Sequence, residues 1–233
     1  MPEGVSLSKR SAVFIDLGLM EYKKALALQA KTLESKINRM ISEDYIFFVE
    51  HPPVFTLGKR GGEENLTVSR EFLKSKKIDV IQTDRGGNIT FHGPGQAVLY
   101  PIVDLENKRI GVKDFVFGLE EIMKQTLLDF GINADRKSLN HGIWVGDAKI
   151  GSVGISIKKG ISIHGLAMNI YPDLEPFSWI NPCGLTNISM TSIEKEIKKR
   201  STSAELPMKK IKESFIKHFS SLLNYDISEH HAD

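Results

Sequence analysis

Residues 137–157 read KSLNHGIWVGDAKIGSVGISI and contain two apolar runs on either side of a short turn. Residues 143–145 and residues 150–157 have the length and apolar character typical of strands. The Gly-Asp-Ala turn at 146–148 lies between them, so the stretch predicts a β-hairpin. Lys149 then begins the second strand, where a lysine is ordinarily a solvated edge residue because lysine is rarely buried. Whether Lys149 instead lines a functional site depends on the rest of the chain.

Strands and helices are expected on both sides of this hairpin. The other expected strands are residues 45–49, 54–57, 80–83, 98–103, 161–164 and 166–170. One helix is expected over residues 21–41, with an apolar face made of Tyr22, Leu26, Leu33, Ile37 and Met40. The others are expected from an N-cap at Asp114 to a stop at Gly131, from Pro207 to Leu222, and over a short stretch that begins at Thr191. Because helices and strands mix without a regular βαβ alternation, we predict an α+β fold with a mixed β-sheet and packed helices.

The bulk properties are those of an ordinary globular protein. The chain has 233 residues, of which 41% are hydrophobic and 26% charged, and its net charge is +2. We expect one catalytic domain over residues 1–233, with a core of about 10–225 and a frayed end from about Ser228. No apolar run reaches the length of a spanning helix, and no secretion signal is visible, so we expect a cytoplasmic protein with neither nucleic acid nor membrane as a partner.

The densest glycine cluster is residues 84–96, DRGGNITFHGPGQ, which holds four glycines, a proline, an arginine and a histidine. Glycines of this density bring backbone N–H groups close to a ligand or to another segment of the chain. The cluster matches no nucleotide-binding fingerprint, since no G-x-G-x-x-G opens a helix and no P-loop occurs. From the residues alone it is either a binding loop or a structural one.

The chain has a single cysteine, Cys183, in the sequence INPCGL at 180–185. A lone cysteine is commonly a small buried hydrophobe, but the flanking proline and glycine form a tight turn that tends to present the thiol. A reactive thiol needs a cationic neighbour, and the candidates are His92, His164 and Lys149. A histidine partner suggests a papain-like hydrolase, whereas a lysine partner suggests acyl transfer. The remaining histidines show no metal-ligand spacing, so no metal is expected, and His51 before two prolines is interpreted as a turn residue.

Five motifs in this order resemble the octanoyltransferase family, also called lipoyl(octanoyl) transferases or lipoate-protein ligase B. They are EHPPVFTLG at 50–58, RGGNITFHGPGQ at 85–96, GDAKIGSVG at 146–154, HGLAMN at 164–169 and NPCG at 181–184. The resemblance covers roughly residues 10 to 225. It implies the fold of the biotin and lipoate protein ligases and a transfer of octanoyl groups from octanoyl-acyl carrier protein. The implied acceptors are lysines on the lipoyl domains of 2-oxoacid dehydrogenase E2 subunits and on the glycine cleavage H protein.

The resemblance also implies roles for individual residues. Cys183 takes the place of the nucleophile and Lys149 that of the catalytic lysine. The implied substrate-binding residues are Arg85, Gly86, Gly87, Asn88, Ile89, Thr90, Phe91, His92, Ser152, Val153, Gly154, Gly165, Leu166 and Ala167. The departures from the family pattern are conservative: Phe91 stands where the family often has tyrosine, and Leu166 where it often has phenylalanine.

On this interpretation one lysine serves both half-reactions, since its charge favours the thiolate of Cys183 and its amine accepts a proton from the acceptor lysine. An apolar slot lined by Ile89, Val153, Leu166 and Ala167 is expected to hold the acyl chain. Because the donor is already a thioester, neither ATP nor a cofactor is expected. The alternatives are an ATP-dependent lipoate-protein ligase of the same fold, which would not need Cys183, and an acyl-binding module without chemistry.

Overall fold

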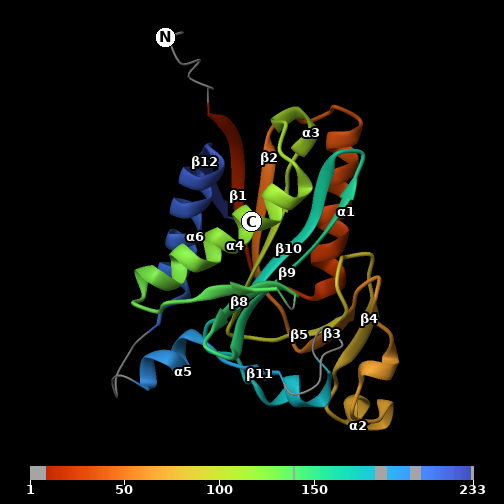
Figure 1. Ribbon diagram of the computed structural model, residues 1–233. Coiled ribbons are helices and arrows are strands. Elements are labelled where there is room, and N and C mark those ends of the chain that lie inside the picture. Colours follow the sequence, from red (N-terminus) through yellow and green to blue (C-terminus); the bar gives the residue numbers. More distant parts are fainter. Residues whose placement is uncertain (1–8, 139, 182–187, 200–205, 232–233) are drawn as a thin grey trace.

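The computed structural model describes residues 9–138, 140–181, 188–199 and 206–231. Within them, nine strands form one sheet in the order β12, β1, β2, β6, β10, β9, β8, β7, and β11 pairs with β9 (Figure 1). These strands are β1 (Arg10–Leu19), β2 (Asp44–Glu50), β6 (Gln96–Ile102), β7 (Asp135–Lys137), β8 (Asn140–Val145), β9 (Ala148–Lys158), β10 (Ile161–Asn169), β11 (Ser189–Met190) and β12 (Tyr225–His231). β1 is parallel to β2 and β12, and β11 is parallel to β9, whereas the other pairs are antiparallel. The sheet is therefore mixed, which confirms the predicted fold class.

A smaller sheet in the order β4, β3, β5 lies beside the large one (Figure 1). Its strands are β3 (Val54–Leu57), β4 (Asp79–Gln82) and β5 (Ile89–His92). The helices are α1 (Tyr22–Ile37), α2 (Arg70–Ser75), α3 (Leu105–Lys108), α4 (Val112–Asp129), α5 (Ile193–Lys198) and α6 (Met208–Leu223), and two 3₁₀ turns span Glu63–Asn65 and Glu175–Trp179.

The two faces of the large sheet bury different helices (Figure 1). On one face, sheet residues such as Phe48 and Leu99 pack in one cluster with Leu119 of α4 and Phe215 of α6. On the other face, α1 covers β2, β6 and β10 through a second cluster of buried apolar side chains. This packing follows from the alternation of side chains along each strand, which gives the sheet two apolar faces.

The hairpin predicted from residues 143–157 is confirmed. Val145 of β8 pairs with Ala148 of β9, so Gly146 and Asp147 make a two-residue turn. Gly146 has a φ of 55°, a left-handed conformation that glycine adopts without steric cost.

Three details of the predicted helices are wrong. The helix expected over residues 21–41 ends at Ile37, because Arg39 turns left-handed with a φ of 56°, and Met40 is 75% exposed instead of buried. Gly111, not Asp114, occupies the N-cap of α4, and Asp114 lies in the first turn, where a carboxylate suits the helix dipole. Ser192, not Thr191, caps α5, since its side chain accepts a hydrogen bond from the backbone N–H of Lys195.

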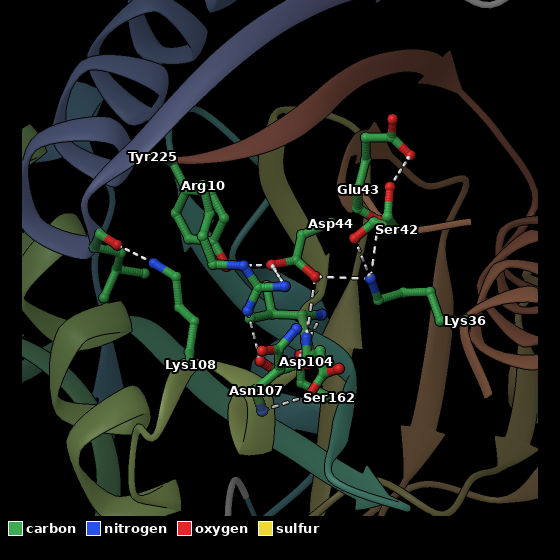
Figure 2. A network of polar contacts seen from close by, with 12 residues as sticks. Arg10, Lys36, Ser42, Glu43, Asp44, Asp104, Asn107, Lys108, Ser162 and Tyr225 are labelled. Carbon is green, nitrogen blue, oxygen red and sulfur yellow. Dashed lines mark hydrogen bonds and ion pairs between the residues drawn. The ribbon is translucent and has the colours of Figure 1, made fainter. Parts of the chain in front are cut away.

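The C-terminal stretch from Ser228, expected to be frayed, continues β12 as far as His231 and pairs with β1. A buried carboxylate, Asp44, joins this edge of the sheet to the rest (Figure 2). Its oxygens accept from Lys36 Nζ at 2.8 Å and from the Tyr225 hydroxyl at 2.5 Å, while Arg10 lies at 3.6 Å. Burial and the Asp44 charge raise the pKa of Tyr225 well above its usual value. Charge neutralisation and hydrogen bonds therefore make the burial of Asp44 tolerable.

Candidate active site

A cavity of about 870 Å³ lies between the smaller sheet and strands β9 and β10 of the large one. Its wall is formed by residues 85–90 and His92, by residues 152–155 of β9, by residues 164–167 of β10, and by residues 136–138, 140 and 141 around the start of β8. One further part of the wall consists of Tyr22, Val98 and Tyr100. Another consists of Val116 and Glu120 of α4.

The glycines of the 84–96 stretch allow this loop to lie directly against β9. The backbone N–H of Gly86 donates to the carbonyl of Ile155 at 2.9 Å. A Cβ on Gly154 would lie 2.9 Å from the Gly86 carbonyl oxygen, and one on Gly58 would lie 2.5 Å from that of Gly87. The glycines therefore serve close backbone packing, and the loop that they shape also forms a wall of the cavity.

Of the substrate-binding residues inferred from the sequence, all but one line this cavity. They are Arg85, Gly86, Gly87, Asn88, Ile89, Thr90, His92, Ser152, Val153, Gly154, Gly165, Leu166 and Ala167. The exception is Phe91, whose ring packs on Phe55 and Phe177 at centroid distances of 5.3 and 5.5 Å in the core of the smaller sheet. Phe91 belongs to the apolar cluster of the smaller sheet together with Ile89, which shares its face of β5, but only Ile89 of the two also reaches the cavity wall.

Lys149 is not the solvated edge residue that its hairpin position suggested, since only 1% of its surface is exposed. Its Nζ donates to Asn140 Oδ1 at 2.5 Å and to the carbonyl of His141 at 3.1 Å, and it lies 5.7 Å from the centre of the Trp144 ring. The side chain also lines the cavity. A buried ammonium needs such acceptors because an unpaired charge is very costly inside a protein.

His92 and His164 are the other two candidate cations. Burial lowers the pKa of His92 to about 3, which favours its neutral form. Burial also lowers the pKa of His164, against the opposing effect of Asp84, whose Oδ1 lies 2.7 Å from His164 Nε2. Of the three candidates, Lys149 is the one whose side chain is ordinarily cationic at neutral pH.

His51, expected to be a turn residue, lies between β2 and β3 and is buried, with partners at both ring nitrogens. Nδ1 lies 2.6 Å from the carbonyl of Met20, which can only accept, so Nδ1 carries the proton. Nε2 then accepts from the Tyr100 hydroxyl at 2.8 Å. Burial lowers the pKa of His51 to about 4.

A chain of hydrogen bonds connects the loop to the strand that carries Lys149. Arg85 Nε donates to Thr56 Oγ1, which lies 3.5 Å from His92 Nε2, and His92 Nδ1 lies 2.6 Å from Gln96 Oε1. Gln96 Nε2 donates to Asn169 Oδ1, whose amide donates to the carbonyl of Thr191. The N–H of Thr191 finally donates to the carbonyl of Lys149 at 2.9 Å. Motif residues without an assigned role, Gln96 and Asn169, thus join the two sides of the site.

Cys183 lies outside the described residues. The chain on either side of it is fixed, since the N–H of Asn181 donates to the carbonyl of Asn65 at 2.8 Å, and Ser189 and Met190 of β11 pair with Ala148 and Lys149. Met190, seven positions after Cys183 in the sequence, therefore lies beside Lys149.

Sequence reasoning missed Glu120, Arg136 and Asn140, which also line the cavity. One signal for Glu120 was available. It follows Leu119 and precedes Ile122 and Met123 among the buried positions of α4, where a charged residue is unusual. No group of three or more metal-ligating side chains occurs among the described residues. In the same part of the chain, no helix is long and apolar enough to cross a membrane.

The fold is the one seen in biotin and lipoate protein ligases. The chain superimposes on a lipoate protein ligase from Thermoplasma acidophilum with a TM-score of 0.71 and 16% identity, covering 97% of this chain and 88% of that one. A lipoate-protein ligase A structure with bound ATP gives a TM-score of 0.71 over 97% and 90% of the two chains, at 16% identity. A biotin protein ligase from Leishmania major gives a TM-score of 0.53 at 12% identity, covering 92% of this chain and 75% of that one. At such identities the likeness establishes the fold.

Sequence comparison narrows the class. Residues 21–220 match the lipoyl protein ligase A/B catalytic domain. An octanoyltransferase of Desulfotalea psychrophila is 48% identical over 184 residues, which are 78% of this chain and 82% of the relative. An octanoyltransferase of Alkaliphilus metalliredigens is 40% identical over 216 residues, or 92% and 96% of the two chains. This chain therefore belongs to the octanoyltransferase family, within the lipoyl protein ligase A/B catalytic domains, and is an acyltransferase.

Proposed function

We propose that this protein transfers an octanoyl group from octanoyl-acyl carrier protein to the target lysine of lipoyl domains through a thioester on Cys183. The lipoyl domains of 2-oxoacid dehydrogenase E2 subunits and the glycine cleavage H protein are the proposed acceptors. The observation that carries the proposal is the buried, hydrogen-bonded Lys149 in the wall of an 870 Å³ cavity. The acceptor class is supported by the structural relative from Thermoplasma acidophilum, which was described together with its E2 lipoyl domain.

The first half-reaction needs a thiolate at Cys183, because the thiol itself is a poor nucleophile and has an ordinary pKa of about 8.5. A positive charge nearby favours the thiolate. Burial lowers the pKa of both His92 and His164, which favours their neutral forms, so Lys149 is the proposed source of that charge. Ser189, which pairs with Ala148 next to Lys149, follows Cys183 by six positions, and six such steps span at most about 22 Å even when fully extended. The thiolate sulfur then attacks the donor thioester carbon, and the bond from that carbon to the carrier's sulfur breaks. The carrier leaves as a thiolate that can take up the proton of Lys149, which leaves this lysine neutral for the second step.

The second half-reaction is an aminolysis. The acceptor lysine has an ordinary pKa of about 10.4 and must lose a proton before its nitrogen attacks the acyl carbon on Cys183. Lys149 is the proposed acceptor of that proton, since a lysine in a partly desolvated site can act as a base. An amide forms as the thioester breaks and Cys183 leaves as a thiolate. Replacing a thioester by an amide is downhill, so this route requires no nucleotide.

The apolar part of the wall suits a medium-length acyl chain. Ile89, Val153, Leu166 and Ala167 all lie in the cavity wall, and Ile89 and Leu166 are 1% and 2% exposed. Moving methylene groups from water into such surroundings gains about 0.8 kcal/mol each, so an octanoyl chain gains several kcal/mol. We assign these four residues to the acyl slot.

The decisive experiment incubates the purified protein with octanoyl-acyl carrier protein without ATP and follows its intact mass. The expected result is the addition of one octanoyl group that neutral hydroxylamine removes and that Cys183→Ala does not acquire. Adding a lipoyl domain should then move the group to the domain with nucleotide removed by apyrase.

Three results would contradict the proposal. Labelling of the Cys183→Ala protein would exclude the cysteine as the nucleophile. Loss of transfer that returns only with ATP and free octanoate would identify an ATP-dependent ligase, and tight binding of the donor without any transfer would identify an acyl-binding module.

A further inference from the structure

Glu120 of α4 is a buried carboxylate in the cavity wall, with 6% of its surface exposed. Its Oε1 accepts from the backbone N–H of Gly142 at 2.9 Å, and His141 Nδ1 lies 3.3 Å from the same oxygen. Its Oε2 accepts from Arg136 Nε at 3.0 Å. A buried carboxylate is stable only with such donors. Glu120 therefore binds α4 to the segment that runs from Arg136 to Gly142.

This segment also holds Lys149. Gly142 has a φ of +139°, and a Cβ there would lie 2.7 Å from Lys149 Cε and 2.3 Å from the carbonyl oxygen of Gly151. The aliphatic stem of Lys149 thus passes over Gly142 in space that any side chain would fill. Beyond the stem, Lys149 Nζ reaches Asn140 Oδ1 and the carbonyl of His141. Residues 140–142 form one surface against which the lysine lies.

The sheet alone does not fix this surface well. The pairing of β8 with β9 shifts register between Ile143 and Trp144, and the pairing of β7 with β8 is irregular between Asp135 and Lys137. Such irregularities leave the local backbone less constrained than a regular ladder does. The contacts from α4 supply the missing constraint. Besides the bonds to Glu120, Arg136 Nη2 donates to the carbonyl of Phe117 at 3.0 Å and to Glu121 Oε2 at 2.8 Å.

We propose that Glu120 is a positioning residue for Lys149, which it orients through the N–H of Gly142 and through Arg136, without touching the reacting atoms. The inference rests on the proposed role of Lys149 in the two half-reactions. Reacting groups must be placed to within a fraction of an ångström, and a displacement of about 1 Å reduces rates on the order of 10²-fold. Glu120→Gln keeps the shape of the side chain but removes its charge and turns one of its two acceptor oxygens into a donor.

The test combines Glu120→Gln with Lys149→Ala, each alone and together, and measures octanoyl transfer to a lipoyl domain. Glu120→Gln alone should lower kcat by roughly ten- to a hundredfold with little change in KM for either substrate. In the Lys149→Ala background the same change should have almost no further effect, since residues that act through one another are not additive. An independent readout is the rate of Cys183 alkylation by iodoacetamide between pH 5 and 9. Its midpoint in Glu120→Gln should move upward, toward that of Lys149→Ala.

Asp114→Asn is the control for the charge change, because it removes one carboxylate from the exposed first turn of the same helix, where the residue does not line the cavity. It should leave transfer and alkylation within about twofold of wild type. A Glu120→Gln protein with normal transfer, or one whose loss adds fully to that of Lys149→Ala, overturns the inference while the role of Lys149 stands. Full activity of Lys149→Ala overturns both.

Discussion

The buried histidine His51 should make the stability of this protein sensitive to mild acid. The pKa of His51 is about 4 in the folded protein and about 6.5 in an unfolded chain. Below pH 6.5 His51 therefore binds a proton in the unfolded chain, whereas in the folded protein it stays neutral down to about pH 4. The contribution of His51 to the free energy of unfolding is complete above about pH 6.5 and is lost as the pH falls. Between pH 7 and pH 5 the loss from this one residue is about 2 kcal/mol. That is a large fraction of the ~5–15 kcal/mol by which such proteins are stable.

The assay compares wild type with His51→Gln by urea unfolding at pH 7, 6 and 5. Glutamine can donate to the carbonyl of Met20 and accept from the Tyr100 hydroxyl, as the neutral imidazole does. Acid-sensitive groups that do not contact His51, including the pair of Asp84 and His164, are present in both proteins and cancel in the difference. His92, whose ring centroid lies 5.7 Å from that of His51, is the neighbour whose pKa the substitution also changes. The variant should lose about 2 kcal/mol less than wild type over this range. Parallel pH dependences in the two proteins would refute a neutral, buried His51.

Three further predictions concern the lysine and the packing around the site. Lys149→Arg keeps the positive charge but cannot release its proton, so Cys183 should still be acylated while aminolysis fails. Rapid-quench mass spectrometry should show the acyl-enzyme accumulating. Normal turnover of this variant would contradict the role of Lys149 as proton acceptor. Gly165→Ala should sharply lower the melting temperature, because its Cβ would lie 1.9 Å from the Leu99 carbonyl oxygen of the neighbouring strand. The control is Gly118→Ala on α4, whose Cβ would lie 3.0 Å from a Leu223 methyl group, and it should leave the melting temperature unchanged or raise it. Asp44→Ala should cost about 3–5 kcal/mol in urea unfolding, because it leaves the Lys36 ammonium buried without its carboxylate, and a cost below that of a single hydrogen bond would contradict this account.

Local patterns in the sequence were sufficient for the elements that depend on local interactions. The hairpin around Gly146 follows from two apolar runs and a short turn, and the α6 helix begins next to Pro207 as its sequence indicates. Strand β1 and the edge strand β12 were missed because the two pair in parallel across the two ends of the chain, from Arg10 with Tyr225 onward. No local pattern contains that information.

The site was predictable to the extent that its residues carry a motif. The glycine-rich loop and the 164–169 stretch do, and the structure brings both to one cavity. Glu120 could not be assigned a role from the sequence, because its partner Gly142 lies 22 residues away and neither residue signals the contact. Lys149 illustrates the same limit, since the pattern around it fits a solvated edge as well as a buried site, and only the tertiary neighbours Asn140 and Trp144 distinguish the two.

Lys149 is held from two directions, and the second connects it to the proposed substrate loop. Its side chain rests on residues 140–142, while its backbone carbonyl accepts from Thr191 at the end of the hydrogen-bond chain that starts at Arg85. The contact between His92 and Thr56 in that chain depends on a neutral His92, which donates from Nδ1 to Gln96 and can accept at Nε2. A protonated His92 would present a second donor to Thr56 Oγ1, which already accepts from Arg85, and the Thr56 hydroxyl could no longer donate to it. The burial that makes His92 unsuitable as the cation of the site is thus the same feature that lets it connect the loop to the lysine.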